Sequence, residues 1–247
     1  MKTSGNTILV TGGGSGIGRE LAQRWHDMGN VVIVAGRSEG SLRETAAGRA
    51  NMHIMRLDIA DPADIARFAG EILAAHPALN VLVNNAGIMR FEDIAAPRDL
   101  ADAEDTVATN LLGPIRLIDA LVAHLQQAED AAIVNVTSGL AFVPMPRAAT
   151  YSATKAALHS YTVSLRVKLA GAVEVIEIAP PAVQTELTPG QATRDGYMPL
   201  DSFIAETMAP FEAGEVPAEV LTGMVLFLRN AEIEGRFDEA LAAVSSH

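Results

Sequence analysis

Short runs of apolar, often β-branched residues recur along the chain, and longer segments with helical spacing separate them. Each run is only a few residues long and is apolar at successive positions, which is typical of strands in a parallel sheet covered on both faces. The predicted strands are 7–10, 31–35, 52–57, 81–83, 132–136 and 173–178. Their alternation with helices predicts an α/β fold, with a doubly wound parallel sheet in three layers (α/β/α).

Two of the intervening segments carry apolar stripes at helical spacing. The first stripe contains Ile17, Leu21, Trp25 and Met28, and Gly29 is suited to cap the C-terminal end of that helix. The second stripe runs through 107–125. Both segments are therefore predicted to be helices that pack one apolar face against the sheet.

The residue pattern changes after residue 187, where regular strand and helix periodicity gives way to frequent proline and glycine. Residues 188–215 contain several prolines and glycines around short apolar patches, which predicts a loop with small helices that acts as a substrate lid. Residues 217–229 are predicted to form a surface helix, and 233–247 an acidic helical or frayed tail. No repeat or linker precedes residue 187, so we expect 1–247 to form a single domain.

Composition narrows the function classes. The 247 residues are 49% hydrophobic and 19% charged, which excludes intrinsic disorder, and the absence of cysteine excludes disulfides and thiol chemistry. The formal net charge of −12, concentrated beyond residue 170, argues against partners such as nucleic acid or anionic membranes. The six histidines lack metal-ligand spacing, so no metal site is expected. Without a visible secretory signal or membrane-length apolar stretch, we expect a soluble cytoplasmic protein.

A glycine-rich turn joins the first predicted strand to the first helix. Glycines allow a tight turn and close approach of the backbone to a phosphate, and the helix N-terminus offers free N–H groups. The candidate phosphate-binding residues are Gly12, Gly14, Ser15, Gly16, Ile17 and Gly18. Their spacing, Gly-x-x-x-Gly-x-Gly, differs from the usual dinucleotide fingerprint, so a plain strand-to-helix connection is the alternative. The position at the first strand of an α/β pattern favours the nucleotide interpretation.

Arg37 follows the second predicted strand, about twenty residues after the glycine turn. An acidic residue at this place binds the ribose 2′-hydroxyl of NAD, whereas an arginine suits the 2′-phosphate of NADP. Ala35, Gly36 and Arg37 include no acid, and a guanidinium can bind a phosphate bidentately. We therefore expect NADP(H) to be favoured over NAD(H); the alternative is a solvated loop arginine.

Three candidate catalytic residues follow the fifth predicted strand. Ser138 lies at the carboxyl end of that strand, and Tyr151 and Lys155 are four residues apart, on one face of a predicted helix. A free tyrosine has a pKa of about 10, so acid–base work near neutrality needs a lower value, which a nearby ammonium favours. Ser138 could donate a hydrogen bond to a carbonyl oxygen. On spacing alone, a partly buried ring beside a solvated lysine is the commoner situation.

Taken together, these residues resemble the short-chain dehydrogenase/reductase family along nearly the whole chain to about residue 187. The matching motifs are Thr11-Gly-Gly-Gly-Ser-Gly-Ile-Gly18, Asp58, Asn84-Asn-Ala-Gly87, Asn110, Ser138 and Tyr151-x-x-x-Lys155. The resemblance implies a Rossmann-type fold of about seven strands and a catalytic tetrad of Asn110, Ser138, Tyr151 and Lys155. In that family tyrosine is the acid/base, lysine lowers its pKa and grips the nicotinamide ribose, serine polarises the carbonyl, and asparagine interrupts its helix and anchors a water.

The resemblance also implies cofactor roles for residues outside the glycine turn. Asp58 would bind the adenine, Asn84 and Gly87 would line the nucleotide cleft, and Thr185 would meet the nicotinamide carboxamide. Further cofactor-binding candidates are Ile59, Ala86, Tyr151, Lys155, Pro181 and Val183. Pro181 stands where the family commonly has a glycine, which stiffens that loop.

The last third departs from the family pattern. Residues 233–247 show neither the glycine-rich seventh strand nor the Asp-Gly-Gly turn with which the family usually closes. In the family that segment often builds a tetramer interface, so its altered pattern argues against a tetramer here. The family's other self-association surface is formed by the two long helices, and we therefore expect a homodimer through the helices that carry Asn110 and Tyr151. The run 180–187 and the segment 198–205 resemble a DltE-like branch of the family.

The resulting hypothesis is an NADP(H)-dependent oxidoreductase that interconverts a carbonyl and a secondary alcohol. The candidate substrate-lining residues are Ser138, Leu140, Phe142, Met145 and Tyr151, with Gly139 and Met89, and their apolar character suggests a small hydrophobic carbonyl compound. The alternative is a nucleotide-sensing protein that has lost turnover, although all four tetrad residues are present. An extended-type sugar-nucleotide epimerase would need a larger carboxyl-terminal domain.

Overall fold

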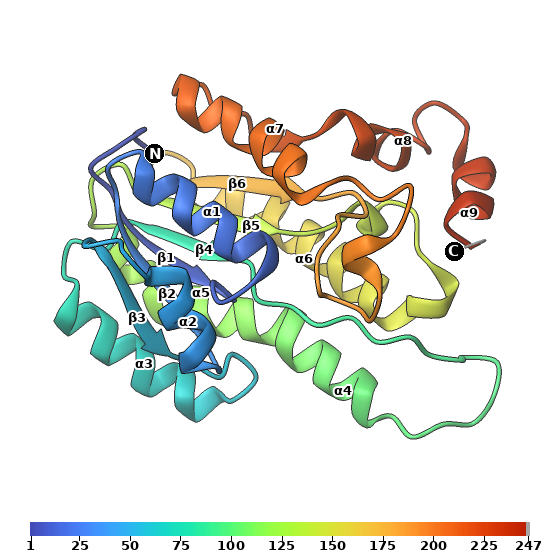
Figure 1. Cartoon of the computed structure of the whole chain (residues 1–247), viewed down its shortest axis with the longest axis horizontal. Coiled ribbons are helices and arrows are strands. Elements are labelled where there is room, and N and C mark those ends of the chain that lie inside the picture. Colours follow the sequence, from blue (N-terminus) through green and yellow to red (C-terminus); the bar gives the residue numbers. More distant parts are fainter. Residues whose placement is uncertain (246–247) are drawn as a thin grey trace.

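The computed structural model describes residues 1–245, which form a seven-stranded parallel sheet with helices on both faces (Figure 1). The strand order is β3-β2-β1-β4-β5-β6-β7, which confirms the doubly wound arrangement expected from sequence. The strands are β1 (Thr7–Thr11), β2 (Val31–Gly36), β3 (Met52–Arg56), β4 (Val81–Asn84), β5 (Ala132–Val136), β6 (Glu174–Ala179) and β7 (Glu219–Leu221).

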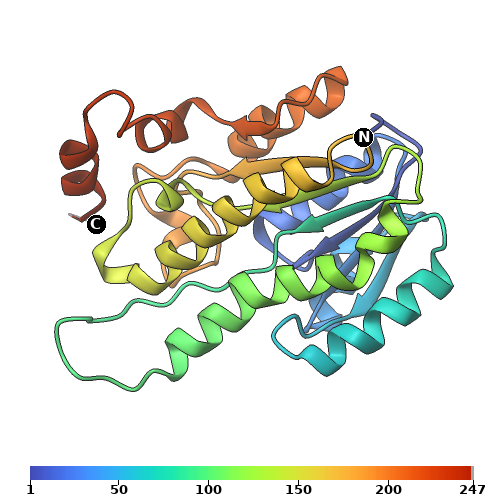
Figure 2. The same ribbon diagram turned by 180° about the vertical axis from the view of Figure 1, so that it is seen from behind.

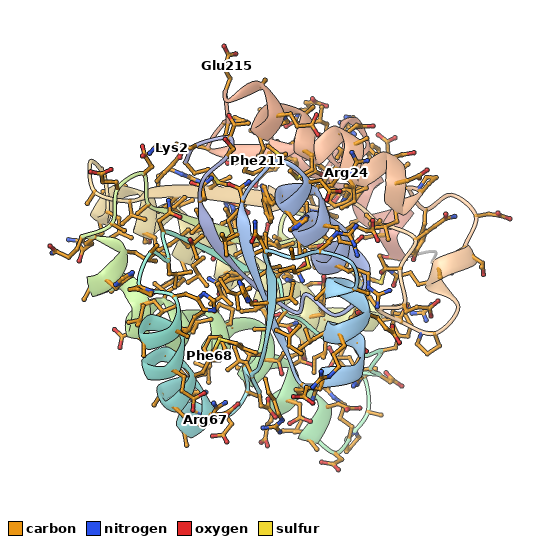
Figure 3. All side chains as sticks on the ribbon, turned by 60° about the vertical axis from the view of Figure 1, so that its left-hand side comes forward. Lys2, Arg24, Arg67, Phe68, Phe211 and Glu215 are labelled. Carbon is orange, nitrogen blue, oxygen red and sulfur yellow. The ribbon has the colours of Figure 1, made fainter. Side chains whose placement is uncertain are left out.

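The helices divide between the two faces of the sheet. One apolar core lies beneath α1, α2 and α7, and the other lies beneath α3, α5 and α6. Figure 2 shows the ribbon from behind, with α5 and α6 toward the viewer. Phe211 and Phe68 belong to these two opposite cores, whereas Arg67 and Glu215 point outward (Figure 3). The helices are α1 (Gly16–Asp27), α2 (Glu39–Ala46), α3 (Pro62–Ala75), α4 (Ala101–Val107), α5 (Gly113–Leu125), α6 (Ala149–Lys168), α7 (Leu200–Ala213), α8 (Leu226–Arg229) and α9 (Phe237–Ser245).

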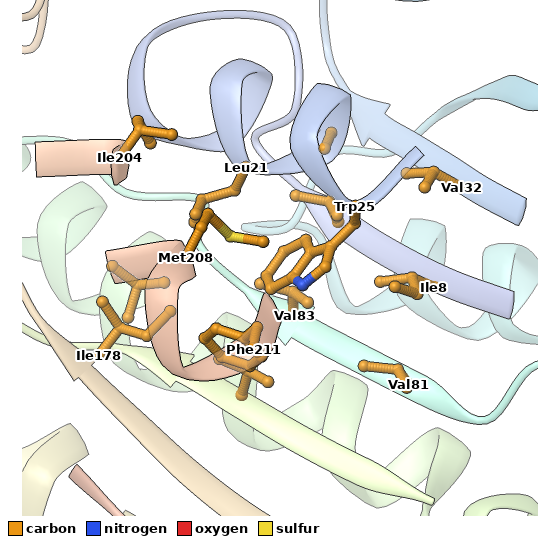
Figure 4. Close-up of a cluster of buried hydrophobic side chains, with 14 of the residues drawn as sticks. Ile8, Leu21, Trp25, Val32, Val81, Val83, Ile178, Ile204, Met208 and Phe211 are labelled. Carbon is orange, nitrogen blue, oxygen red and sulfur yellow. The ribbon is translucent and has the colours of Figure 1, made fainter. Parts of the chain in front are cut away.

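Helix α7 corrects the prediction that 188–215 is a loop with small helices. The segment has that character only as far as Pro199, and the next fourteen residues form one helix packed into the core. Phe211 of α7 meets Trp25 of α1 edge-on, with ring centroids 5.5 Å apart (Figure 4). Pro199 precedes the helix and Gly214, in the left-handed conformation, ends it, so two of the residues that suggested a loop instead mark helix boundaries.

The prediction of a surface helix over 217–229 is also wrong. This segment contains the edge strand β7, a 3₁₀ turn (Gly223–Val225) and the single turn of α8. The seventh strand that seemed missing from the tail is therefore present at Glu219–Leu221, where it pairs with β6. Three residues are too few to show a strand period. The tail itself is helical in α9, and its last two residues lie outside the described part.

The second apolar stripe becomes a composite helix, in which α4 and α5 flank a π-helical segment (Ala108–Leu112). By length and composition it is the one helix within residues 1–245 that could cross a membrane. Its inner face, which includes Leu117, Leu121 and Leu125, packs in the core beneath the sheet. That packing accounts for the apolar stripe.

The reversal of strand order falls between β1 and β4. In open α/β sheets such a switch point creates a crevice at the carboxyl ends of the strands. Thr11 closes the two halves there, because its hydroxyl donates to Val83 O (3.2 Å) and accepts from the N–H groups of Asn85 (3.0 Å) and Ala86 (3.1 Å). The loops that carry the candidate site residues all leave the sheet at the carboxyl ends of its strands.

Candidate active site

A cavity of about 410 Å³ runs along this edge, from the glycine turn to the candidate catalytic residues. Most of the residues that we predicted from the sequence to bind the cofactor line this cavity. Its lining includes Gly12, Ser15, Gly16, Ile17, Gly18, Arg37, Asp58, Ile59, Ala86, Gly87, Ser138, Tyr151, Lys155, Pro181, Val183 and Thr185. Gly14 and Asn84 are the two cofactor candidates that do not line it.

The glycine turn presents the N-terminus of α1 to this cavity. Ser15 is the N-cap residue but makes no capping bond with its side chain, so it leaves the first-turn N–H groups to the cavity. Gly12 and Gly16 have φ of 65° and 49°, a conformation that other residues rarely adopt. A Cβ on Gly18 would lie 2.4 Å from Gly12 O, so this glycine is also required for packing of the turn. The cradle fits the pyrophosphate of a dinucleotide.

The back of the turn is held by two residues that sequence reasoning missed. Arg19 donates to Gly14 O (2.6 Å), and the buried Thr45 hydroxyl donates to Gly13 O (2.9 Å). Arg19 also donates to Thr45 Oγ1 (3.2 Å), which links the two supports. Gly14 therefore lies on the side of the turn that faces α2, not on the cavity side.

Asn85, not Asn84, faces the cavity. Asn84 still belongs to β4, is buried, and donates to Asn135 Oδ1 (2.9 Å) beneath the site. Asn85 donates to Thr11 O (3.0 Å) and Gly12 O (3.3 Å), so it supports the turn from the cavity wall. Adjacent residues point to opposite sides at a strand end, and two consecutive asparagines give no signal of which one faces in.

Arg37 lies at the far end of the cavity, just after β2. Its side chain is exposed, and within residues 1–245 no ion pair engages it, so the guanidinium is available to an anion. Ser38 beside it caps α2 by accepting from Ser41 N (3.4 Å). Asp58 lies across the cavity and accepts from Ala60 N (3.1 Å), a local capping bond that leaves carboxylate oxygen capacity on the cavity side.

Three of the tetrad candidates, Ser138, Tyr151 and Lys155, line the opposite end of the cavity, whereas Asn110 is fully buried beside them and does not line it. Tyr151 and Lys155 share a face of α6 and are both buried, with Lys155 Nζ 5.6 Å from the centre of the Tyr151 ring. Lys155 Nζ donates to Val136 O (2.8 Å), and the Ser138 side chain hydrogen-bonds Tyr151. A Cβ on Gly87 would be 3.4 Å from Asn110 Oδ1 and 3.7 Å from Lys155 Nζ, which places both side chains against the same glycine.

Asn110 interrupts its helix as the resemblance implied. It sits in the π-helical segment between α4 and α5 with its side chain fully buried. Its Oδ1 accepts from Ile88 N (2.8 Å) and its Nδ2 donates to Ile88 O (2.8 Å). The two bonds fasten the loop after β4 to the composite helix, beside Lys155.

Burial dominates the acid–base properties of the pair on α6. It raises the pKa of Tyr151 to about 12, and the hydrogen bond from Ser138 lowers it only in part. Burial also lowers the pKa of Lys155 to about 8. For Tyr151 this is the reverse of the shift expected from sequence, because desolvation outweighs the Ser138 bond and the ammonium lies 5.6 Å from the ring centre.

A second, smaller cavity of about 190 Å³ adjoins the first, and Ser138 and Tyr151 line both. Predicted substrate residues Gly139, Leu140, Met145 and Met89 line it, and the predicted lid segment 188–215 contributes Gln191 and Tyr197. The lining also includes residues that sequence did not single out: Phe91, Leu187, Leu228 and Val244. Phe142 lies outside both linings. Its ring packs edge-on against His159 (4.9 Å) and carries the Arg229 guanidinium on its face (4.7 Å).

Gln191 connects the two cavities. Its Nε2 donates to Val183 O (2.8 Å) and Thr185 Oγ1 (3.2 Å), and its Oε1 accepts from the Thr188 hydroxyl (2.8 Å). The side chain is buried and lines both cavities. The predicted lid segment is thus fixed to Thr185, and nothing in the local sequence distinguishes this glutamine.

Comparison with known proteins gives consistent matches. Residues 6–195 match the family model described as short chain dehydrogenase. The curated uncharacterized oxidoreductase DltE of Bacillus subtilis is 45% identical over 197 residues, which are 79% of this chain and 77% of the relative.

Solved structures match over most of the chain. A short chain dehydrogenase from Burkholderia cenocepacia in complex with NADP superposes with a TM-score of 0.83, at 26% identity and 98% coverage of both chains. The 3-ketoacyl-(acyl-carrier-protein) reductase from Brucella melitensis complexed with NADH gives a TM-score of 0.78, at 25% identity, over 89% of this chain and 97% of that one. The two structures hold different nicotinamide cofactors.

Proposed function

Since this chain belongs to the short-chain dehydrogenase/reductase family, in the branch of DltE, we propose that it interconverts a carbonyl and a secondary alcohol with NADP(H) as cofactor. The observation that carries this proposal is that Ser138 and Tyr151 stand where the two cavities meet. A dinucleotide in the larger cavity and a carbonyl compound in the smaller one would adjoin at these side chains. The bound cofactor would supply the hydride in reduction and accept it in oxidation.

The side chains divide the remaining work. In reduction, Ser138 donates a hydrogen bond to the carbonyl oxygen, and Tyr151 gives that oxygen its proton as the alcohol forms. A pKa of about 12 keeps Tyr151 protonated at neutral pH, as an acid requires. Lys155, whose pKa is about 8, lies one helical turn away and supplies positive charge near the phenol.

The cofactor proposal rests on the two ends of the larger cavity. The uncapped N-terminus of α1 suits the pyrophosphate. Lys155 of the tetrad and Thr185 line the same cavity, where a nicotinamide ribose and carboxamide would be held. Arg37 at the other end suits a 2′-phosphate, which favours NADP(H) over NAD(H). We therefore propose that cofactor preference depends on this one guanidinium.

The substrate proposed is a small, neutral and mainly apolar carbonyl compound. The smaller cavity is lined mostly by Met, Leu, Phe and other apolar residues, and among residues 1–245 its lining includes no Lys, Arg or His. A carboxylate, phosphate or sulfonate would enter it without a counter-charge, which is costly for a desolvated anion. Asp195 at the lining and the net charge of −12 add repulsion.

We also propose a cytoplasmic homodimer that forms through the composite helix and α6. Leu112, Val163 and Val167 are 37%, 41% and 74% exposed on these helices, an apolar surface suited to self-association. Light scattering at micromolar protein concentration is expected to give the mass of two chains. A single monomeric species would remove this part of the proposal.

The test of the chemistry is Tyr151→Phe, with Tyr161→Phe on the same helix as the matched control. NADPH oxidation is followed with a panel of neutral ketones and aldehydes, and NADPH binding is measured separately. We expect Tyr151→Phe to abolish turnover with little change in NADPH affinity, and Tyr161→Phe to retain both. Turnover by Tyr151→Phe would refute the role of the phenol, and wild-type protein that binds NADPH without reducing any compound would favour a sensor.

A further inference from the structure

The helix that carries Tyr151 has no N-terminal cap of its own. Helix α6 begins at Ala149, and the preceding Ala148 has no side-chain atom that can accept a hydrogen bond. The first N–H groups of a helix have no intrahelical partner and need acceptors, most of all where they are buried. Ala148 and Tyr151 are both buried, so the first turn of α6 depends on acceptors from elsewhere.

Glu92 supplies an acceptor for one of these N–H groups, that of Thr150, from a loop 58 residues earlier in the chain. One carboxylate oxygen accepts from Thr150 N, and the other accepts from Thr150 Oγ1 (2.9 Å). The Glu92 side chain is only 10% exposed, which strengthens both bonds. Thr150 directly precedes Tyr151, so the carboxylate fixes the turn from which the phenol projects.

The same loop is fastened to the start of α6 by further contacts. Glu92 N donates to Arg147 O (2.9 Å), and the Arg147 guanidinium lies over the Phe91 ring at 3.8 Å. On the outer side, Arg98 donates to Glu92 Oε2 (2.7 Å). Phe91 is part of the lining of the smaller cavity. One short segment thus joins a wall of that cavity to the first turn of the helix.

We propose that Glu92 is a positioning residue for the reaction, which caps α6 and thereby holds Tyr151 against Ser138. The carboxylate also lies at the positive end of the helix dipole, where it stabilises the turn. Loss of the cap would let the first turn of α6 fray, and Tyr151 would leave its place for part of the time. The effect on turnover rests on the proposed function, whereas the effect on the Thr150 N–H does not.

The experiment compares Glu92→Ala and Glu92→Gln with Glu71→Ala, a control that removes another glutamate paired with an arginine, on α3. Amide hydrogen exchange at Thr150, NADPH affinity, and kcat and KM for a neutral ketone are measured on the full chain. For Glu92→Ala we expect exchange at Thr150 about tenfold faster, the size of a lost cap. We expect kcat to fall about tenfold or more, because small misplacements of catalytic groups are costly, while NADPH affinity stays within about twofold.

Glu92→Gln is expected to restore most of both properties, since its amide oxygen still accepts from Thr150 N, and Glu71→Ala is expected to match the wild type. Faster exchange at Thr150 with unchanged kcat would overturn the positioning role. Unchanged exchange in Glu92→Ala would overturn the cap itself. If wild-type protein reduces no carbonyl compound, the proposed function fails, and the exchange data still decide whether Glu92 caps α6.

Discussion

Replacing Arg37 by alanine is expected to weaken NADPH binding while it leaves NADH binding almost unchanged. The guanidinium is exposed at the end of the larger cavity, and within residues 1–245 no carboxylate pairs with it. A hydrogen bond to a charged group contributes about 1.5–3 kcal/mol, and solvent screening at an exposed site reduces this. A loss of about 1.4–2.5 kcal/mol corresponds to an NADPH dissociation constant roughly 10- to 70-fold higher.

Thermal or chemical unfolding in the presence of each cofactor measures this change. A ligand at a hundredfold excess over its dissociation constant stabilises the folded protein by about 2.7 kcal/mol. A tenfold weaker ligand at the same concentration stabilises it by only about 1.4 kcal/mol. The NADPH-induced stabilisation should therefore fall by about half in Arg37→Ala. In the wild type, high salt should also reduce the stabilisation by NADPH, because it screens the attraction between the guanidinium and the phosphate.

Arg43→Ala is the matched control, because it removes an exposed arginine from the neighbouring helix α2, outside the cavity lining. The informative quantity is the ratio of NADPH to NADH dissociation constants, which cancels general damage to the cleft. If that ratio is the same in wild type, Arg37→Ala and Arg43→Ala, Arg37 does not read the 2′-phosphate. A wild type that prefers NADH would refute the argument at its start.

Three further predictions concern packing, pH and the lid. Phe211→Ala is expected to destabilise the protein by about 3–5 kcal/mol in urea unfolding followed by fluorescence of Trp25, whereas the half-exposed Phe227→Ala should change little. The hydrogen bond to Glu177 raises the pKa of His159. The stabilisation that this histidine contributes is therefore complete below its unfolded pKa of about 6.5 and is lost as the pH rises through its folded pKa. His159→Gln should then cost more stability at pH 6 than at pH 9. An equal cost at both pH values would contradict this. Gln191→Leu should raise KM for both NADPH and carbonyl substrate by about 3- to 10-fold, since a lost side-chain hydrogen bond costs about 1 kcal/mol; an effect on only one KM would show that it does not couple the cavities.

The strands and the first helix could be predicted because their signals are local. The apolar run 132–136 coincides with β5, and Gly29 does take a positive φ of 90° just beyond α1. Short-range sterics and burial on both faces of a sheet leave a direct trace in the residue order. The candidate tetrad was proposed on different grounds. The spacing of Tyr151 and Lys155 alone favoured an ordinary ring beside a solvated lysine, and only the resemblance of the whole set of motifs to a known family singled these residues out.

The errors arose where tertiary contacts decide. Pro210 lies inside α7, and the burial of Phe203 and Phe211 against α1 outweighs the cost of that proline. β7 is an edge strand of three residues that exists because β6 offers it a partner. The direction of a side chain is decided in the same way. Phe142 turns toward His159 and not toward the smaller cavity, which no pattern in the chain reveals.

The pKa of Tyr151 illustrates a further limit. Sequence places a lysine four residues away and so predicts a lowered value, but the value depends on dielectric surroundings that only the fold defines. Because both side chains are buried, the pKa of Tyr151 is raised and that of Lys155 is lowered, and each change favours the uncharged form. Charge spacing along a helix therefore predicts which groups interact and not which effect dominates.

The single hydroxyl of Thr11 has a consequence for how the molecule is made. It joins β1 to β4 across a sequence separation of 72 residues, and the cleft wall that it supports includes Asn85 and Ala86. A growing chain completes its glycine turn early, yet it has no cleft until β4 has been synthesised and has docked beside β1. The lining of the cavity is then still incomplete until Thr185 has been added. Such distant pairings form late and slowly. A dinucleotide would therefore find its complete cavity only after Thr185 has been synthesised and has folded into place. Its binding would protect the folded molecule from unfolding without guiding the earlier stages of folding.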